Sequence, residues 1–303
     1  MPRVSIVIPA YYSHDTIEQT LLAFREQTYR DFEVVIVNSS PETITQGLIT
    51  RKFPEVNFEQ SPTRLFPHAA RNRAIARSGG ELLVMTDPDC RAQPDWLEKL
   101  VAAHDAGHPV VGGGMGLATR RWFERGAHLV KFSWLLPGLP AGFRWIVPSA
   151  NALYPRSLLE KLGRLDDLLF CGDAVLAWRA GDAGARPWFE PSAVVEHRHE
   201  GNLIAFTRMR FRRGIEFGHA RIAFEGRTRG RAAIEALLMP LRAIITLVRA
   251  GKDSVRAGWG TIFVFTLPVQ ILGQFGWCLG EALAQVQTVF RGRRDPSRRG
   301  VSP

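Results

Sequence analysis

Cysteine is scarce in this chain: among 303 residues there are three cysteines, Cys90, Cys171 and Cys278. Three widely spaced cysteines provide neither a disulfide framework nor a cysteine-based zinc site. The first residues show no basic leader and no cleavage site before the apolar run at 4–8, so they do not predict a signal peptide. We therefore expect an intracellular protein.

Charge is also limited, at 22% of residues, whereas 46% are hydrophobic. A disordered chain would show the reverse balance, so a folded protein with a sizeable core is expected. The net charge of +10 belongs to the last third. Residues 1–196 contain 21 Lys and Arg against 22 Asp and Glu, and residues 197–303 contain 18 against 7. No helix-turn-helix or RNA-binding signature accompanies these arginines, so nucleic acid is not the expected partner.

Short β-rich runs alternate with runs of helical spacing in the first part of the chain. The expected strands are 4–8, which ends at Pro9, then 32–37 and 81–85, and the expected helices are 16–27 and 68–77. Such alternation predicts an α/β fold with a parallel sheet covered by helices on both faces. Ligands bind these sheets at the carboxyl ends of the strands.

Two carboxylates, Asp87 and Asp89, follow the third expected strand where the chain turns. Such a pair can share a hard divalent cation, or divide a cation and a ribose hydroxyl between them. An acidic turn explains the same two residues equally well.

Several motifs occur in a fixed order. They are residues 4–11, 33–40, 70–76 and 87–89, followed by 149–156, 163–166, 172–173 with Arg179 and Gly181, and 195–197. Over roughly residues 3–215 this succession resembles the family 2 glycosyltransferases of GT-A fold. The resemblance implies a Rossmann-like, mostly parallel sheet with helices on both faces in residues 1–225. Residues 226–303 are expected to form basic, amphipathic and hydrophobic helices that associate with a membrane and end in a disordered tail.

The resemblance also implies a metal site. Asp89 matches the ligand of a Mg²⁺ or Mn²⁺ ion that bridges the donor diphosphate, and Asp87 its partner toward ribose or metal. His197 and His199 follow the apolar run 193–195, which we expect to be the last strand of the domain. His197 matches a histidine that completes the metal or diphosphate site and is preferred to His199 for its place after this strand, although a surface histidine beside Arg198 is an equal alternative.

Around the nucleotide the resemblance implies three further contacts. Residues 9–11, which are Pro9, Ala10 and Tyr11, match the loop around the base, and Arg71 matches a basic residue that faces the nucleotide. For Arg71 a solvated helix position is the alternative. Asn38 stands where most relatives have aspartate and would contact the pyrimidine ring or the ribose. It can still donate and accept hydrogen bonds, but it brings no charge.

Asp173 resembles the carboxylate that acts as catalytic base in inverting members of the family. Arg179 either orients its loop or lies on a solvated face. The acidic pair that usually ends in this base is reduced here, because Gly172 precedes Asp173. This loss weakens acceptor binding, shifts the base to Asp166 or Asp167, or marks a protein that binds a nucleotide sugar without turnover. No Gln-x-x-Arg-Trp element of processive synthases is present, so single addition is favoured.

The C-terminal part predicts membrane association. Residues 232–250 form an amphipathic helix pattern with a kink expected at Pro240, and residues 257–280 pass without a charge. In-plane or re-entrant association with the cytoplasmic leaflet is preferred to a single span, and a soluble helical pair packed on the domain remains open. The arginines at 208, 210, 212 and 213 suit either the donor diphosphate or lipid headgroups.

The aromatic segment 115–147 lies where relatives bind the acceptor, and we expect it to face a lipid-linked glycan or lipid, with core packing as the alternative. These features together predict a metal-dependent, inverting glycosyltransferase at the cytoplasmic face of the cell membrane. It would use a nucleotide-diphosphate sugar to extend a lipid-linked or cell-envelope glycan. The alternative is a catalytically silent nucleotide-sugar-binding or assembly protein of the same fold.

Overall fold

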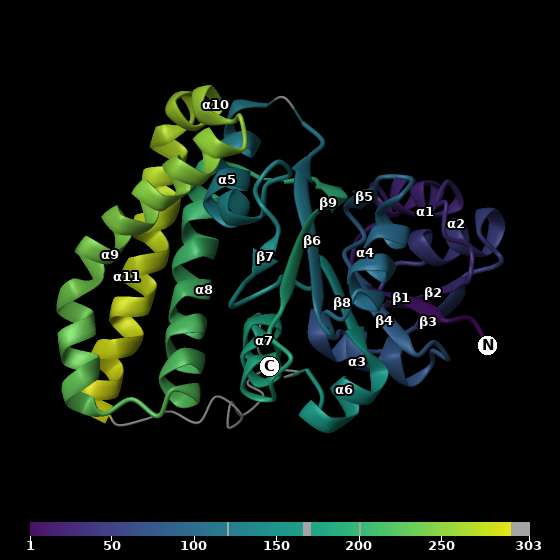
Figure 1. Cartoon of the computed structure of the whole chain (residues 1–303), viewed down its shortest axis with the longest axis horizontal. Coiled ribbons are helices and arrows are strands. Elements are labelled where there is room, and N and C mark those ends of the chain that lie inside the picture. The colour runs from purple at the N-terminus through teal and green to yellow at the C-terminus, as the bar shows by residue number, and fades with distance from the viewer. Residues whose placement is uncertain (120, 166–170, 200, 292–303) are drawn as a thin grey trace. The chain divides into compact units, whose positions relative to one another are not determined.

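The computed structural model describes residues 1–119, 121–165, 171–199 and 201–291, and it divides into two compact units (Figure 1). Among the described residues, the sheet unit comprises 1–118, 140–165 and 172–198. The helical unit comprises the rest, chiefly 121–139 and 201–291. The domain boundary predicted after residue 225 stays a prediction, and the predicted disordered tail lies outside the described residues from 292 onward.

The sheet unit is built on a single sheet with strand order β3-β2-β1-β4-β8-β6-β9-β5, in which β7 also pairs with β9. The strands β1 to β4 run parallel, whereas β8 is antiparallel to β4 and to β6. Their bounds are β1 (Val4–Ala10), β2 (Phe32–Asn38), β3 (Asn57–Gln60), β4 (Leu82–Thr86), β5 (Cys90–Ala92), β6 (Val111–Leu117), β7 (Gly142–Phe143), β8 (Asn151–Pro155) and β9 (Trp188–His197).

In the described part of the sheet unit, six helices accompany this sheet. They are α1 (Ile17–Arg25), α2 (Ile44–Lys52), α3 (Pro67–Ala76), α4 (Trp96–Asp105), α6 (Arg156–Leu162) and α7 (Gly172–Asp182). On one face, small and aliphatic residues of α3, α6 and α7 pack on buried residues such as Val7, Met85 and Tyr154. The α1–α4 side is closed by Phe24, which stacks on Trp96. The predicted fold class, an α/β sheet with helices on both faces, is confirmed.

Two predicted strand ends were too early. β1 continues through Pro9 to Ala10. Proline has no backbone N–H to donate, but the pairing of β1 with β4 ends at Val7↔Met85, before Pro9, so no hydrogen bond from Pro9 to β4 is needed. β9 includes His197 instead of ending before it, because this residue pairs with Cys90 of β5. Long-range pairing of this kind is invisible to the periodicity of one segment.

The helical unit contains α5 (Trp122–Phe132), the 3₁₀ turn η1 (Ser133–Leu135), α8 (Leu203–Phe224), α9 (Arg229–Arg256), α10 (Gly260–Phe265) and α11 (Leu267–Arg291). In Figure 1 the three long helices α8, α9 and α11 lie side by side, and α11 packs against both others. Glycines permit the close crossing of α8 and α11. A Cβ atom on Gly214 would lie 2.2 Å from the Trp277 carbonyl oxygen, and one on Gly280 would lie 2.1 Å from the Phe211 carbonyl oxygen.

We therefore expect Gly280→Ala to lower the free energy of unfolding by about 1–3 kcal/mol, because the added methyl group meets backbone that cannot rotate away. Gly230→Ala in α9 is the matched control, since nothing lies within 4 Å of its Cβ position. This control should leave stability unchanged or slightly raised. Urea unfolding of the two variants measures the difference, and equal stabilities would contradict the close crossing.

The structure contains the helix predicted over 232–250, but it does not form one helix over the uncharged run 257–280. α9 runs from Arg229 to Arg256 and continues through Pro240, whereas the uncharged run 257–280 is divided between α10 and the start of α11. Among the described residues, none of the helices combines the length and the apolar character that crossing a bilayer requires. Within the aromatic segment 115–147, Leu135 and Leu136 are fully buried, while Phe143 and Trp145 are exposed.

Candidate active site

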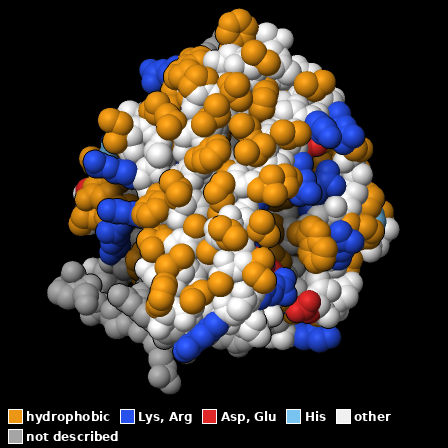
Figure 2. Space-filling view, turned by 90° about the vertical axis from the view of Figure 1, so that its left-hand side faces the viewer, with side chains coloured by type: hydrophobic (Ala, Val, Ile, Leu, Met, Phe, Trp, Pro, Cys, Tyr) orange, Lys and Arg blue, Asp and Glu red, His pale blue; other side chains and the backbone are white. Residues whose placement is uncertain are grey.

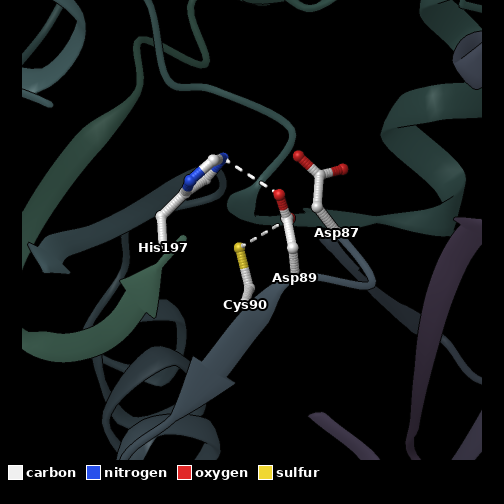
Figure 3. A group of neighbouring side chains, drawn as sticks. All are labelled: Asp87, Asp89, Cys90 and His197. Atoms are coloured by element: carbon white, nitrogen blue, oxygen red, sulfur yellow. Dashed lines mark hydrogen bonds and ion pairs between the residues drawn. The ribbon is translucent and has the colours of Figure 1, made fainter. Parts of the chain in front are cut away.

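The carboxyl end of β4 and the end of β9 bring four potential ligands together (Figure 3). Asp87 and Asp89 follow β4, and the chain then enters β5, where Cys90 pairs with His197 across to β9. One ligand atom from each of these four residues lies within 4.8 Å of all the others. Asp89 and His197 are more than a hundred residues apart in the sequence, and the β5–β9 pairing brings them side by side.

The group is held by contacts around Asp89. His197 Nε2 lies 3.9 Å from Asp89 Oδ2, and the backbone N–H of Arg198 donates to the Asp89 carbonyl at 3.2 Å. Cys90 is fully buried, and burial, with the nearby charges of Asp89 and Asp87, raises the pKa of its thiol well above the usual range. Two carboxylates and an imidazole suit Mg²⁺ or Mn²⁺, whereas a protonated thiol is a poor ligand for either ion. The residues present therefore fit a hard divalent cation.

Arg71, from α3, lies behind this group. Its guanidinium is only 2% exposed, and its Nη2 donates to Asp87 Oδ1 and, at 3.5 Å, to the Ser149 carbonyl. The sequence prediction places Arg71 against the nucleotide. That contact stays a prediction. The structure shows that Arg71 is a buried cation that pairs with Asp87 and holds this carboxylate in position.

Asp173, in the first turn of α7, is connected to Arg71 through the backbone of Ser149. Its carboxylate accepts the N–H of Ser149 at 3.3 Å and that of Ala174 at 2.8 Å. Burial raises the pKa of Asp173 above the usual value for aspartate, while the two backbone donors and the charge of Arg71 act against this rise. A carboxylate with a raised pKa is suited to accept a proton near neutral pH.

The absent side chain at Gly172 has a physical reason. A Cβ atom at this position would lie 2.7 Å from Cδ2 of His68, which is buried at the start of α3. His68 thus occupies the space beside Gly172. His68 and Arg71 are three residues apart in α3 and therefore lie on the same face of this helix. Sequence reasoning missed His68, and this spacing was the available signal. The alternative bases Asp166 and Asp167 lie outside the described residues.

The predicted nucleotide residues lie at the ends of β1 and β2. Pro9, Ala10 and Asn38 are buried, and Ser39 N donates to the Ala10 carbonyl at 2.9 Å. The Asn38 side chain donates to Gln60 Oε1 at 2.8 Å and accepts from Ser40 Oγ at 2.7 Å. Its amide is thus engaged within the protein, and the predicted contact of Asn38 with the pyrimidine ring or the ribose stays a prediction.

Tyr11 is the exposed member of this group, at 40% exposure. The guanidinium of Arg64 lies 4.8 Å from its ring centroid, and the next residue, Tyr12, has a φ of 49°. A left-handed backbone at a non-glycine residue is strained and directs this loop outward from the strand. The result is an exposed aromatic and cationic surface at the end of β1, suited to the face of a nucleobase.

Other residues named from the sequence lie elsewhere. His199 belongs to the helical unit, where its Nε2 is 3.0 Å from Nδ1 of His128. Arg210 packs over the Trp277 ring at 4.1 Å, and burial lowers its pKa to about 9. Arg179 donates to the Arg164 carbonyl at 3.4 Å. His197, and not His199, is therefore the histidine of the candidate metal site.

The family model named "Glycosyl transferase family 2" matches residues 5–163, more than half of the chain. The chain belongs to glycosyl transferase family 2. The match includes both strand ends that carry Asn38 and Asp87, together with Arg71, and it stops before Asp173. Membership confirms the resemblance read from the order of motifs, and it makes this chain a glycosyltransferase that transfers sugar from a nucleotide sugar.

Two curated relatives of this family 2 enzyme show how similar it is to known glycosyltransferases and how much of their length it covers. Glycosyltransferase AglE of Haloferax volcanii is 27% identical over 216 residues, which cover 67% of this chain and 70% of AglE. The probable glycosyltransferase YdaM of Bacillus subtilis is 25% identical over 230 residues, 70% of this chain and 54% of YdaM. The chain therefore spans only about half the length of the second relative.

Among solved structures, the family 2 chain is similar to the mannosyltransferase PcManGT of Pyrobaculum calidifontis, determined in complex with GDP-Man and Mn²⁺. The TM-score is 0.57 at 19% identity, over 97% of this chain and 88% of PcManGT. This likeness establishes the GT-A fold of the present chain.

Proposed function

We propose that the protein catalyses metal-dependent, inverting transfer of one sugar from a nucleoside-diphosphate sugar to a hydroxyl group. The observation that carries the proposal is the continuity between two parts of the site. Asp87 and Asp89 with His197 form a candidate cation site at the end of β4, and Arg71 and Ser149 connect Asp87 to Asp173.

In this proposal Asp173 accepts the proton of the acceptor hydroxyl while that oxygen attacks the anomeric carbon opposite the leaving diphosphate. One carboxylate suffices, because a single in-line displacement inverts the configuration. A divalent cation held by Asp87, Asp89 and His197 would supply positive charge where the diphosphate gains negative charge. Arg71 keeps Asp87 oriented and places a fixed positive charge between Asp87 and Asp173.

For the acceptor and location, we extend the proposal to a lipid-linked or cell-envelope glycan at the cytoplasmic face of the membrane. Two features support it: the basic excess after residue 197 and the exposed apolar side chains of α9. Phe143 and Trp145 are exposed aromatics whose ring centroids lie 5.4 Å and 5.0 Å from the Arg186 guanidinium carbon, and they suit contact with a sugar ring.

A catalytically silent nucleotide-sugar-binding protein is the second candidate, because Gly172 lacks a side chain and the Asn38 amide is bonded internally. This candidate predicts nucleotide binding with no sugar transfer from the unmutated protein. Release of nucleoside diphosphate from a panel of nucleotide sugars distinguishes the two candidates.

The test of the donor site is calorimetric titration with uridine, guanosine, thymidine and cytidine diphosphates and their sugars, with and without Mn²⁺. We expect one nucleotide to bind, and its affinity to fall tenfold or more when EDTA removes the metal or when Asp89 is changed to Asn, because the bridging charge is lost. Asp31→Asn, an exposed carboxylate before β2, is the control. Equal affinities with and without metal would reject metal dependence.

A further inference from the structure

The helix α9 is amphipathic in the opposite sense to a soluble surface helix. Its charged residues Glu235 and Arg242 are directed to neighbouring helices, where Glu235 pairs with Arg221 of α8 at 2.9 Å and Arg242 bonds the fully buried Glu281 of α11. Only small or flexible residues such as Met239 and Ala243 complete the buried side. The large aliphatic residues of α9 are left to face outward.

This outward surface is extensive. In Figure 2, hydrophobic side chains are spread over the face formed by α9 and α11, and basic side chains lie mainly toward its margins. Exposure reaches 81% at Leu237 and 72% at Phe265. The docking face, as we define it, consists of the exposed apolar residues of α9 and α10: Ile234, Leu237, Leu238, Leu241, Ile244, Ile245, Val248, Val255, Val264 and Phe265. Continuous apolar surfaces of this kind mark interaction sites.

The exposed charge beside the docking face is of one sign, and the acidic Asp253 between Arg249 and Arg256 is partly buried. Every exposed ionisable side chain of α9 is basic, and these side chains are Arg229, Arg231, Arg249, Lys252 and Arg256. Arg249 and Arg256 are seven residues apart and therefore follow one flank of the apolar stripe. An apolar stripe with a basic border complements acyl chains below a layer of anionic headgroups.

A groove of about 570 Å³ interrupts the docking face where α9 meets α10 and the start of α11. Its walls are largely apolar, from residues including Leu247, Val255, Phe263 and Leu267, and Lys252 and Arg256 also line it. An acyl chain fits the apolar walls, and the two cations suit the phosphate of the same lipid.

We propose that α9 and α10 dock in the plane of an anionic bilayer, with the docking face in the acyl region, the groove filled by one lipid chain, and Arg249, Lys252 and Arg256 at the phosphates. This proposal deepens the membrane location given under the proposed function and rests on it only for the choice of leaflet. A helix of 28 residues is about 42 Å long, so α9 contributes a long in-plane contact. The basic flank favours a bilayer over a second copy of this face, because two such flanks repel.

Flotation of the full chain with vesicles tests the docking. The vesicles contain phosphatidylcholine and phosphatidylglycerol at 3:1, or phosphatidylcholine alone. We expect the protein to float with the anionic vesicles and the double variant Leu237→Asp/Leu241→Asp to lose at least tenfold in partition. Both leucines are exposed, so no core packing is lost. The control Leu22→Asp/Ile44→Asp changes the charge equally at exposed positions of α1 and α2 and should float like the unmutated chain.

The contribution of charge has its own variant. Each cation near an anionic surface contributes about fivefold in partition, so Arg249→Gln/Lys252→Gln/Arg256→Gln should lower binding about a hundredfold. Raised salt should reduce the binding of the unmutated chain in the same direction.

Three results would overturn the proposal: no flotation of the unmutated chain, equal flotation of the Leu237/Leu241 variant, or a dimer in sedimentation that this variant dissociates. Nucleotide titration of the same preparations separates this failure from that of the proposed function. A chain that binds a nucleotide but no vesicle rejects the docking alone, and a chain that floats but binds no nucleotide rejects the donor site alone.

Discussion

Asp173→Asn is expected to lower sugar transfer by about 10²–10⁴-fold while leaving the affinity for the nucleotide unchanged. An amide cannot accept the hydroxyl proton at neutral pH, and general-base catalysis contributes an acceleration of this size. Asparagine keeps the volume and an oxygen for the shorter bond, the 2.8 Å bond from the Ala174 N–H. Only the 3.3 Å bond from the Ser149 N–H to the other oxygen is lost, so the start of α7 should remain folded. Release of nucleoside diphosphate in the presence of acceptor, or slow donor hydrolysis by water, measures the loss.

The control is Asp182→Asn at the opposite, exposed end of the same helix, which should transfer sugar at the normal rate. Two results would contradict the assignment: an active Asp173→Asn variant, which would exclude Asp173 as the base, or a fall in nucleotide affinity equal to the fall in rate, which would make the residue part of donor binding. The two readouts thus distinguish a base from a ligand of the diphosphate.

Much of the donor site could be predicted from the sequence because parallel strands end at one edge of a sheet. Asp87 and Asp89 were found in this way, and His197 was preferred to His199 from its place after an apolar run. The geometry agrees, since His197 lies beside Asp89 and His199 faces His128 in the other unit. These features depend on local order along the chain, which the sequence displays directly.

Contacts between distant segments could not be predicted in the same way. That Arg71 reaches Asp87, and that His68 takes the space beside Gly172, depends on how α3, β4 and α7 pack, which no single periodicity reveals. The period of 3.6 showed that α9 has an apolar stripe. It could not show that Glu235 and Arg242 find buried partners and leave this stripe outside.

Arg71→Met should have two linked effects, because Arg71 is the buried cation between Asp87 and Asp173. Leaving Asp87 without its partner should lower the free energy of unfolding by about 2 kcal/mol. This is below the 3–5 kcal/mol typical of a fully buried pair, because Asp87 is 28% exposed. Urea unfolding measures this loss, and Arg73→Met, which removes a half-exposed arginine two residues along α3, is the control.

The second effect is on the pH dependence of transfer. Burial raises the pKa of Asp173, so the rate of the unmutated enzyme should fall as the pH drops through a value above that of an ordinary aspartate. The charge of Arg71 opposes this rise, so its removal should raise the pKa further and move the acid limb to higher pH. Arg71→Lys keeps the charge and should move the limb less. A merely structural role for Arg71 would lower stability and leave the limb in place, which would contradict the electrostatic coupling between the metal side of the site and its base.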